Sequence, residues 1–442
     1  MSNNKPIITP PIQRATLPYY LTRELVKQGV RRFHRLIVFE GLENLPKGRN
    51  PIILVSNHQN GLMDPMITSG LLKPQLHWLT RADIFWNPIV RKILLVFNQL
   101  PIYRKRDRVP DLKERNKIIW NCCIERLESG AALSLFPEGN HNPQKTIRPL
   151  KPGLSELLGL AVSKHETLKR LKVIPVGVDY EDYPGYRRRL SFRIGKEIEW
   201  SDLYDDKSKS VDFNQLTDRI IDGMRKLSID IRPHAIYDDL YPYVRALRSS
   251  QAKGEKWLSI IKELDRISKV GENKKWSVDL VNAANSLREA GFENSMRSES
   301  WGIKRTEVTK TKMWAVLLVP ISWVANIPTS LQQFLINWRG DNINAIEFRS
   351  TIKVGVGMFV YPISWTLIAI VAGVFTQPFW VGFVGIWTWA TFGNKFYGWL
   401  KGHLHDHKDA IEGLRFWEDA GNEKLRTAWA HYIETIKKDI SS

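Results

Sequence analysis

A histidine and an aspartate, His58 and Asp64, lie in the segment NHQNGLMD, which directly follows the apolar run PIILVS. A carboxylate that accepts a hydrogen bond from one imidazole nitrogen orients the ring and stabilises the imidazolium formed when the other nitrogen takes a proton. Six residues at about 100° each would leave the pair on different faces of a helix. The two side chains therefore meet only across a turn, and Gly61 and Pro65 suit a turn followed by a helix start. We predict a general base at His58, oriented by Asp64.

Two further segments carry groups suited to binding a phosphorylated substrate. Arg104 follows the apolar residues LPIY and begins a run of cations, and arginine can hold phosphate with two donors. The segment FPEG follows an apolar strand pattern, so Glu138 emerges at a strand end and Gly139 permits close approach of a substrate. Lys151 and Gly153 lie where a helix is expected to begin, and a helix start is another anion site. A fourth segment, VIPVGV, is typical of a buried strand.

In this order, NHQNGLMD, LPIYRKR, FPEG and VIPVGV resemble the glycerophosphate and lysophosphatidate acyltransferase family over about residues 35–200. The resemblance implies that His58 removes a proton from an acceptor hydroxyl, which attacks an acyl thioester directly. The donor would be acyl-CoA or acyl-carrier protein, and the acceptor glycerol-3-phosphate, its 1-acyl form or another lysolipid. Neither a cofactor nor a metal is expected. The residues expected to bind substrate are Asn57, Arg104, Glu138, Gly139, Lys151 and Gly153.

Two features depart from the usual family pattern. Five residues separate His58 from Asp64 where four are usual, and this longer spacing is similar to that of fungal-type glycerol-3-phosphate acyltransferases, which also carry membrane segments after the catalytic domain. Asn140, His141 and Asn142 follow FPEG where Thr-Arg-Ser is commoner, which changes the expected acceptor contacts more than the reaction.

The chain must position these segments with an α/β domain. Short apolar runs at 51–56, 131–136, 172–178 and 190–195 alternate with longer helical patterns at 108–129 and 153–169, which predicts a mostly buried central sheet flanked by helices. We divide the chain into an N-terminal extension with a basic amphipathic helix (1–37), a catalytic domain (38–200), a helical accessory region (201–312), a hydrophobic membrane region (313–393) and a charged helical tail (394–442). The helix within 1–37 suits either a membrane surface or an ordinary protein surface.

The membrane region contains two stretches, 313–338 and 354–393, that are almost free of charge and rich in tryptophan. Its segment 354–375 is long enough to cross a bilayer core. Pro320 and Pro328 are expected to interrupt the stretch before it, and Pro378 is expected to form a turn before a short hairpin or re-entrant segment, 378–393. We therefore predict two to three membrane segments. Basic residues flank them on several sides, so the charge distribution leaves the topology open.

The composition of the chain limits the classes of binding partner to expect. A net charge of +19 indicates polyanions such as phosphates and anionic headgroups, and 17 tryptophans favour membrane interfaces. No nucleic-acid module is recognisable. The two cysteines are adjacent and no signal peptide is visible, so we expect a membrane protein whose catalytic domain faces the cytoplasm. The oligomeric state stays open.

Several alternatives remain at this stage. His58, Asp64, Glu138 and His141 could serve a metal-dependent hydrolase, although no HExxH helix is present. The positive charge also suits a non-catalytic protein that binds anionic lipid or nucleic acid. The cluster at His403, His405 and His407 would gather on one side of a strand, but its surroundings predict a helix, where these positions scatter. Ser56 lacks the elbow sequence of an acyl-serine enzyme.

Overall fold

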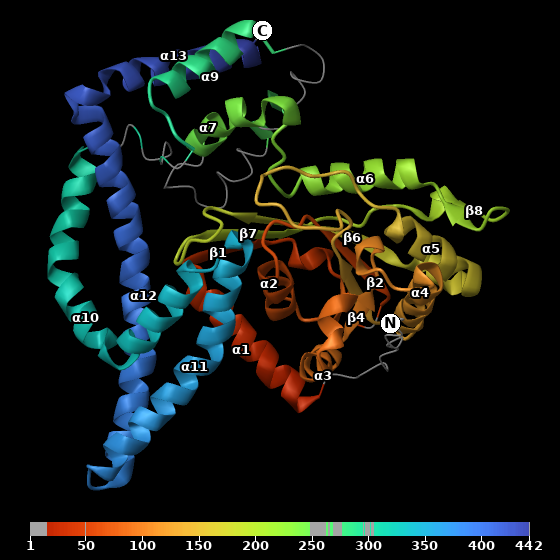
Figure 1. Ribbon diagram of the computed structural model, residues 1–442, viewed down its shortest axis with the longest axis horizontal. Coiled ribbons are helices and arrows are strands. Elements are labelled where there is room, and N and C mark those ends of the chain that lie inside the picture. Colours follow the sequence, from red (N-terminus) through yellow and green to blue (C-terminus); the bar gives the residue numbers. More distant parts are fainter. Residues whose placement is uncertain are drawn as a thin grey trace.

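The structure, a computed structural model, describes residues 16–48, 50–247, 262–263, 266–267, 276–294, 296, 301 and 305–441. The proline-rich segment before residue 16 and most of the charged stretch at 254–269 lie outside these residues. Within the described part, an α/β domain is followed by long helices that extend to one side of it (Figure 1).

A seven-stranded sheet forms the centre of the α/β domain, in the order β1-β7-β6-β2-β5-β3-β4. The strands are β1 Leu36–Glu40, β2 Ile52–Ser56, β3 Leu76–Arg81, β4 Gln99–Ile102, β5 Ala132–Leu135, β6 Lys172–Tyr180 and β7 Arg189–Ile194. Strands β2 to β6 run parallel, whereas β1 and β7 run the opposite way. Every residue of β2 is buried, as expected for an apolar strand inside a parallel sheet. The predicted α/β fold with a mostly buried sheet is confirmed.

Helices cover both faces of this sheet (Figure 1). On one face lie α4 Leu112–Glu128, α5 Gly153–Lys164 and α6 Phe213–Arg225, and on the other lie α1 Leu17–Phe33 and α2 Met63–Leu71. Alternate residues of β2 point to opposite faces, so Ile53 packs with the first layer and Ile52 with the second. Because α6 packs in the first layer, the hydrophobic core of the sheet includes a helix that lies after residue 200 in the sequence.

Smaller elements complete the α/β domain. Helix α3 Pro88–Val96 joins β3 to β4, and the strands β8 Tyr204–Asp205 and β9 Ser210–Val211 form a short antiparallel pair.

A second core lies outside the sheet. It joins α7 Tyr237–Leu247, α9 Val278–Glu289 and α13 Glu423–Ser441, together with Phe416 near the end of α12 Phe379–Glu418. Helices from the accessory region and from the C-terminal tail thus pack on one another, although more than a hundred positions separate α9 from α13 in the sequence.

Three long helices connect the two cores: α10 Arg305–Asp341, α11 Ile346–Val374 and α12. The expectation that Pro320 and Pro328 interrupt the first apolar stretch is wrong, because both lie inside α10, which bends but continues (Figure 1). A proline removes one helical hydrogen bond and kinks the axis without necessarily ending the helix. Pro378 does lie at the predicted turn, but the segment after it is the first part of a 40-residue helix rather than a short re-entrant piece.

Among the described residues, α11 is the one helix long and apolar enough to cross a membrane, where two to three segments were predicted. Helix α10 carries a stripe of polar residues along one face. Ser322, Asn326, Thr329 and Gln333 are all buried, at the spacing of one helix face. Its opposite face is apolar and exposed, with members Val316, Leu317, Ile321, Trp323, Val324, Ile327, Leu331, Phe334, Leu335 and Trp338.

Candidate active site

The predicted histidine–aspartate pair meets at the carboxyl end of β2. Nδ1 of His58 lies 2.8 Å from Oδ2 of Asp64, which belongs to the first turn of α2. The turn at Gly61, where φ is +29°, brings the two together despite the extra residue between them. The contact that a general base requires is therefore present.

Asp64 is fully buried and its oxygens are saturated with donors. The backbone N–H groups of Gln59 and Asn60 each donate to Oδ2 at 2.8 Å, and the hydroxyl of Tyr180 donates to Oδ1. Burial, together with the neighbouring Asp64, holds the pKa of Tyr180 well above its usual value, so this phenol remains a donor. The carboxylate is thus fixed in position and orients the histidine ring.

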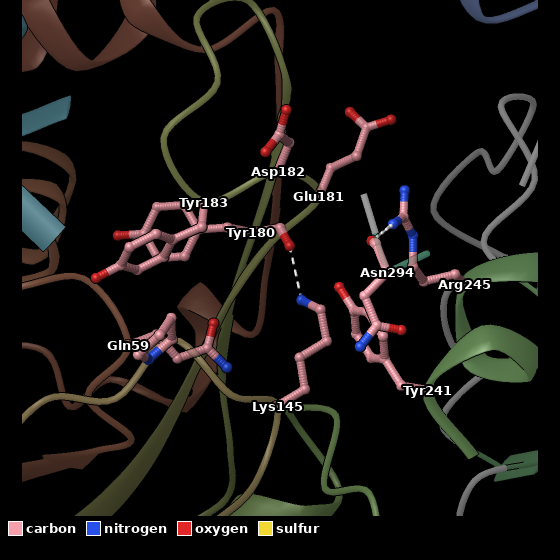
Figure 2. Close-up of a pocket in the computed structure, with 10 residues that line it drawn as sticks. Gln59, Lys145, Tyr180, Glu181, Asp182, Tyr183, Tyr241, Arg245 and Asn294 are labelled. Atoms are coloured by element: carbon pink, nitrogen blue, oxygen red, sulfur yellow. Dashed lines mark hydrogen bonds between the residues drawn. The ribbon is translucent and has the colours of Figure 1, made fainter. Parts of the chain in front are cut away.

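Tyr180 escaped the sequence analysis because the apolar pattern of its strand stops two residues earlier, at Val178. β6 is the parallel neighbour of β2, so its carboxyl end reaches the same sheet edge. Lys145 holds this end by donating to the Tyr180 carbonyl at 2.7 Å and to Asp179 Oδ1 at 2.5 Å. Figure 2 shows Lys145 and Tyr180 on the wall of a cavity of about 270 Å³ that Gln59, the neighbour of His58, also lines.

The ring of His58 is held on its other sides by aromatic contacts. Phe136 stacks on it with centroids 3.9 Å apart and an interplanar angle of 9°, and His141 approaches edge-on at 5.5 Å. Its side chain is 13% exposed, and no hydrogen bond engages its Nε2 within the described part of the chain. A fixed ring whose second nitrogen is not engaged by the described residues is the arrangement a general base needs.

The segment FPEG turns beside this histidine, at the carboxyl end of β5. Glu138 is buried and paired with Arg148 through Oε2, while its Oε1 has no hydrogen-bond partner among the described residues. Burial, opposed by Arg148, raises the pKa of Glu138 to about 7. Arg148 also contacts Asn140, so it clamps the turn from both sides. Sequence reasoning missed Arg148. The signal that could have found it is its charge, since it is a cation only ten residues after Glu138.

Gly139, Lys151 and Gly153 lie together near this turn. Gly139 adopts a φ of +78°, which favours glycine, and a Cβ there would come 3.3 Å from Cγ of Lys151. The backbone N–H of Lys151 donates to the Pro137 carbonyl at 2.8 Å, and Gly153 begins α5 as predicted. These three residues therefore share one corner of the site with Glu138.

Two predicted binding residues are engaged elsewhere. Both ends of the Asn57 side-chain amide bond to the backbone of Val178 at 2.8 Å, so this side chain ties β2 to β6. Arg104 follows β4 and is held by Asp107 at 2.8 Å and by Asp83 at 3.2 Å. Because β5 and β3 separate β4 from β2, three strand spacings, roughly 14 Å, lie between the two strands. Arg104 thus lies at the same sheet edge as His58 but at some distance along it.

The structure also places the residues of the metal-site and acyl-serine alternatives. No set of three or more histidine, cysteine, aspartate or glutamate side chains is placed to hold a metal ion in the described residues. His403, His405 and His407 lie on α12, a helix rather than a strand. Ser56 is buried and donates to the Asn57 carbonyl at 3.0 Å.

Comparison with known proteins bears on residues 36–179, which match the family model described as Acyltransferase. These residues form an acyltransferase domain. The resemblance drawn from the four sequence segments is confirmed, and the domain belongs to the O-acyltransferases.

The relatives agree with this assignment over part of their length. Over 169 residues the chain is 27% identical to "1-acyl-sn-glycerol-3-phosphate acyltransferase LPAT1, chloroplastic" of Arabidopsis thaliana, covering 37% of this chain and 44% of that protein. Over 143 residues it is 28% identical to "1-acyl-sn-glycerol-3-phosphate acyltransferase BAT2, chloroplastic" of Brassica napus, covering 31% of this chain and 39% of that protein. The chain thus spans less than half the length of these two relatives.

Among solved structures, the 1-acyl-sn-glycerophosphate acyltransferase PlsC of Thermotoga maritima aligns at 18% identity with a TM-score of 0.34, covering 48% of this chain and 81% of that one.

Proposed function

We propose that this acyltransferase domain transfers a fatty acyl group from an acyl thioester to a hydroxyl of glycerol-3-phosphate or 1-acylglycerol-3-phosphate, in phospholipid synthesis at a membrane. The observation that carries the proposal is the contact of His58 with the buried, saturated Asp64 beside the FPEG turn. The names of the two plant relatives make 1-acylglycerol-3-phosphate the first acceptor to test.

In the proposed reaction, Nε2 of His58 takes the proton of the acceptor hydroxyl as its oxygen attacks the thioester carbonyl. The new C–O bond forms, the C–S bond breaks, and the leaving thiolate takes the proton from the imidazolium. Asp64 stabilises that imidazolium while it exists. No covalent acyl-enzyme and no cofactor enter these steps.

We assign the acceptor headgroup to the corner made by Glu138, Gly139, Lys151 and the start of α5 at Gly153. Lys151 is exposed and supplies a positive charge there, and the helix start supplies backbone donors. Arg104 is a more distant phosphate ligand in this proposal, and it would have to exchange its contact with Asp83 for one with phosphate. An Arg104→Ala variant should then raise the KM for the acceptor, whereas Arg106→Ala, an exposed neighbour, should not.

The proposed location is a membrane, with the catalytic domain on the cytoplasmic side. Two observations support a bilayer: α11 is long and apolar enough to cross one, and α10 buries its polar stripe while exposing its apolar face. An apolar outer face is favourable against lipid and unfavourable against water. Protease accessibility of the catalytic domain in sealed vesicles of known orientation tests the side.

The reaction is tested with purified membranes, labelled acyl-CoA or acyl-carrier protein, and a panel of glycerol-phosphate and lysolipid acceptors resolved by product. We expect one thioester and one acceptor class to support turnover, and His58→Ala to lower it by about 10²–10⁴-fold. His165→Ala, a partly exposed histidine paired with Glu128, is the matched control and should retain activity. Near-normal turnover in His58→Ala, or the absence of any acylated product from the wild type, would contradict the proposal.

A further inference from the structure

The first turn of α11 lies directly on the catalytic loop. The hydroxyl of Ser350 donates to Oδ1 of Asn60 at 3.1 Å, and both residues are buried. At Gly61, a Cβ would come within 2.9 Å of the Glu347 carbonyl oxygen. The loop that carries His58 and the helix that could cross a membrane are therefore in close contact, although nearly 300 positions separate them in the sequence.

Asn60 connects this contact to the general base. Its backbone N–H donates to Asp64, and its side-chain amide donates to the Tyr183 carbonyl at 3.2 Å while accepting from Ser350. The orientation of Asp64, and through it that of His58, thus depends on a residue that α11 holds from outside the α/β domain.

Glu347 makes a second contact from the same turn. Its Oε1 lies 3.3 Å from Nε2 of His141, whose ring is the edge-on neighbour of His58. Phe348 packs edge-on against the same His141 ring at 5.9 Å. The backbone N–H of Asn142 donates to the His58 carbonyl at 3.0 Å, which keeps this segment beside the base.

These contacts border an open part of the site. The side chains of Glu347 and His141 are 31% and 28% exposed, so an incoming molecule can reach both. The two nitrogens of an imidazole are distinct, so the ring needs a partner to set its orientation. Glu347 supplies that partner.

We propose that the first turn of α11, residues 346–350, forms one wall of the acceptor site, with Ser350 positioning the catalytic loop and Glu347 positioning His141 toward the acceptor. This inference rests on the proposed acyl transfer. It places a wall of the active site on a helix outside the region 36–179 that matches the family. A lipid acceptor would then meet His58 where α11 begins.

Glu347 is tested in the full-length protein by steady-state kinetics with both substrates varied. We expect Glu347→Ala to raise the KM for the acceptor about tenfold with little change in the KM for the thioester, and Glu347→Asp to recover part of the loss. In a His141→Ala background the same substitution should have no further effect, since the two residues act as one unit. Asp341→Asn is the matched control, because Asp341 pairs with Lys353 at the adjoining α10–α11 connection.

Two outcomes would overturn the role of Glu347. One is additivity of the Glu347→Ala and His141→Ala effects, which would show independent action. The other is an equal change in Asp341→Asn, which would show that any perturbed ion pair of the helices has the same effect.

Ser350 is tested by kinetics and by amide hydrogen exchange. Ser350→Ala should lower kcat about tenfold and raise exchange at Gln59 and Asn60, whose N–H groups bind Asp64. Unchanged kcat and exchange would refute the positioning role. Exchange needs no turnover, so if the wild type acylates no acceptor, the proposed function fails while the contact between α11 and the loop is still measured.

Discussion

The α/β domain and the helices α10 to α12 arrange polar and apolar side chains in opposite ways. In the sheet, apolar β2 is wholly buried, and Asp64 beside its end accepts hydrogen bonds from two backbone N–H groups and from Tyr180. In α10 the polar residue Thr329 is fully buried, whereas the apolar residue Trp323 is 68% exposed. Both regions bury polar side chains, but only the α/β domain also buries its apolar ones.

The difference supports the proposal that α10 lies against lipid, whereas the α/β domain lies in water. Water favours burying apolar surface, at roughly 25 cal/mol per Å². Lipid removes that preference, and the buried polar side chains then hold helices together, as Trp365 does by donating to Thr329 Oγ1 at 3.2 Å. We therefore expect substitutions to have opposite consequences in the two regions, and three experiments use that contrast.

The largest effect is expected at the buried polar end of the α/β domain. Asp64→Asn keeps the shape of the side chain but removes the charge that stabilises the imidazolium, and it favours the wrong histidine tautomer. The value of kcat should therefore fall by about 10²–10⁴-fold. Turnover by purified protein measures this, with Asp202→Asn, an exposed carboxylate paired with Arg219, as the control. A loss smaller than threefold would mean that Asp64 is structural and that His58 is oriented without it.

A smaller effect is expected on the outer face of α10. Ile321→Lys places a charge on a side that we propose to lie against lipid, which costs about 2.5–3.5 kcal/mol for a central position in a membrane helix. The fraction of protein retained in membranes after alkaline carbonate extraction should therefore fall. Thr329→Val, on the buried face, should leave that fraction unchanged. If Ile321→Lys partitions like the wild type, this face lies in water and the contrast disappears.

A third effect, of a size similar to the second, concerns the pH dependence of stability through Glu138. Its pKa is raised to about 7, so the neutral acid is the form that the fold favours. The associated stability is fully present below pH 4.5, the ordinary value, and is lost as pH rises through 7, by roughly 3 kcal/mol at about 1.4 kcal/mol per pKa unit.

Glu138→Gln imitates the neutral acid at every pH. Its melting temperature in detergent should therefore gain on the wild type between pH 4.5 and 7 and run parallel above that range. If the difference in melting temperature between Glu138→Gln and the wild type stays constant with pH, or favours the wild type at pH 7, Arg148 keeps the carboxylate ionised in spite of burial.

Much of the catalytic loop could be predicted, because its chemistry is local. His58 and Asp64 lie on one short turn, so residue types and spacing sufficed to predict their contact. Arg104 shows the limit of the same reasoning. Its run of cations suggested a free phosphate ligand, but Asp107, three residues away, and Asp83, on the preceding connection, both hold its guanidinium.

The remaining partners come from distant parts of the chain. Tyr180 reaches Asp64 only because β6 is placed next to β2, and Ser350 reaches Asn60 only because α11 packs on α2 and α1. No periodicity within a segment encodes such pairings. The sequence also does not determine which face of α10 is buried. A helix with one polar stripe can expose that stripe to water or bury it against other helices in lipid.

The sequence by itself determined the α/β class, the acyltransferase resemblance and the pair His58–Asp64, because buried strands and tight turns have local signatures. Only the tertiary structure decided what surrounds the pair: Tyr180 and Arg148 beside it, and Glu347 and Ser350 from the first turn of α11. The reason is physical. Hydrogen bonds and packing act over a few ångströms in space, whatever the separation along the chain.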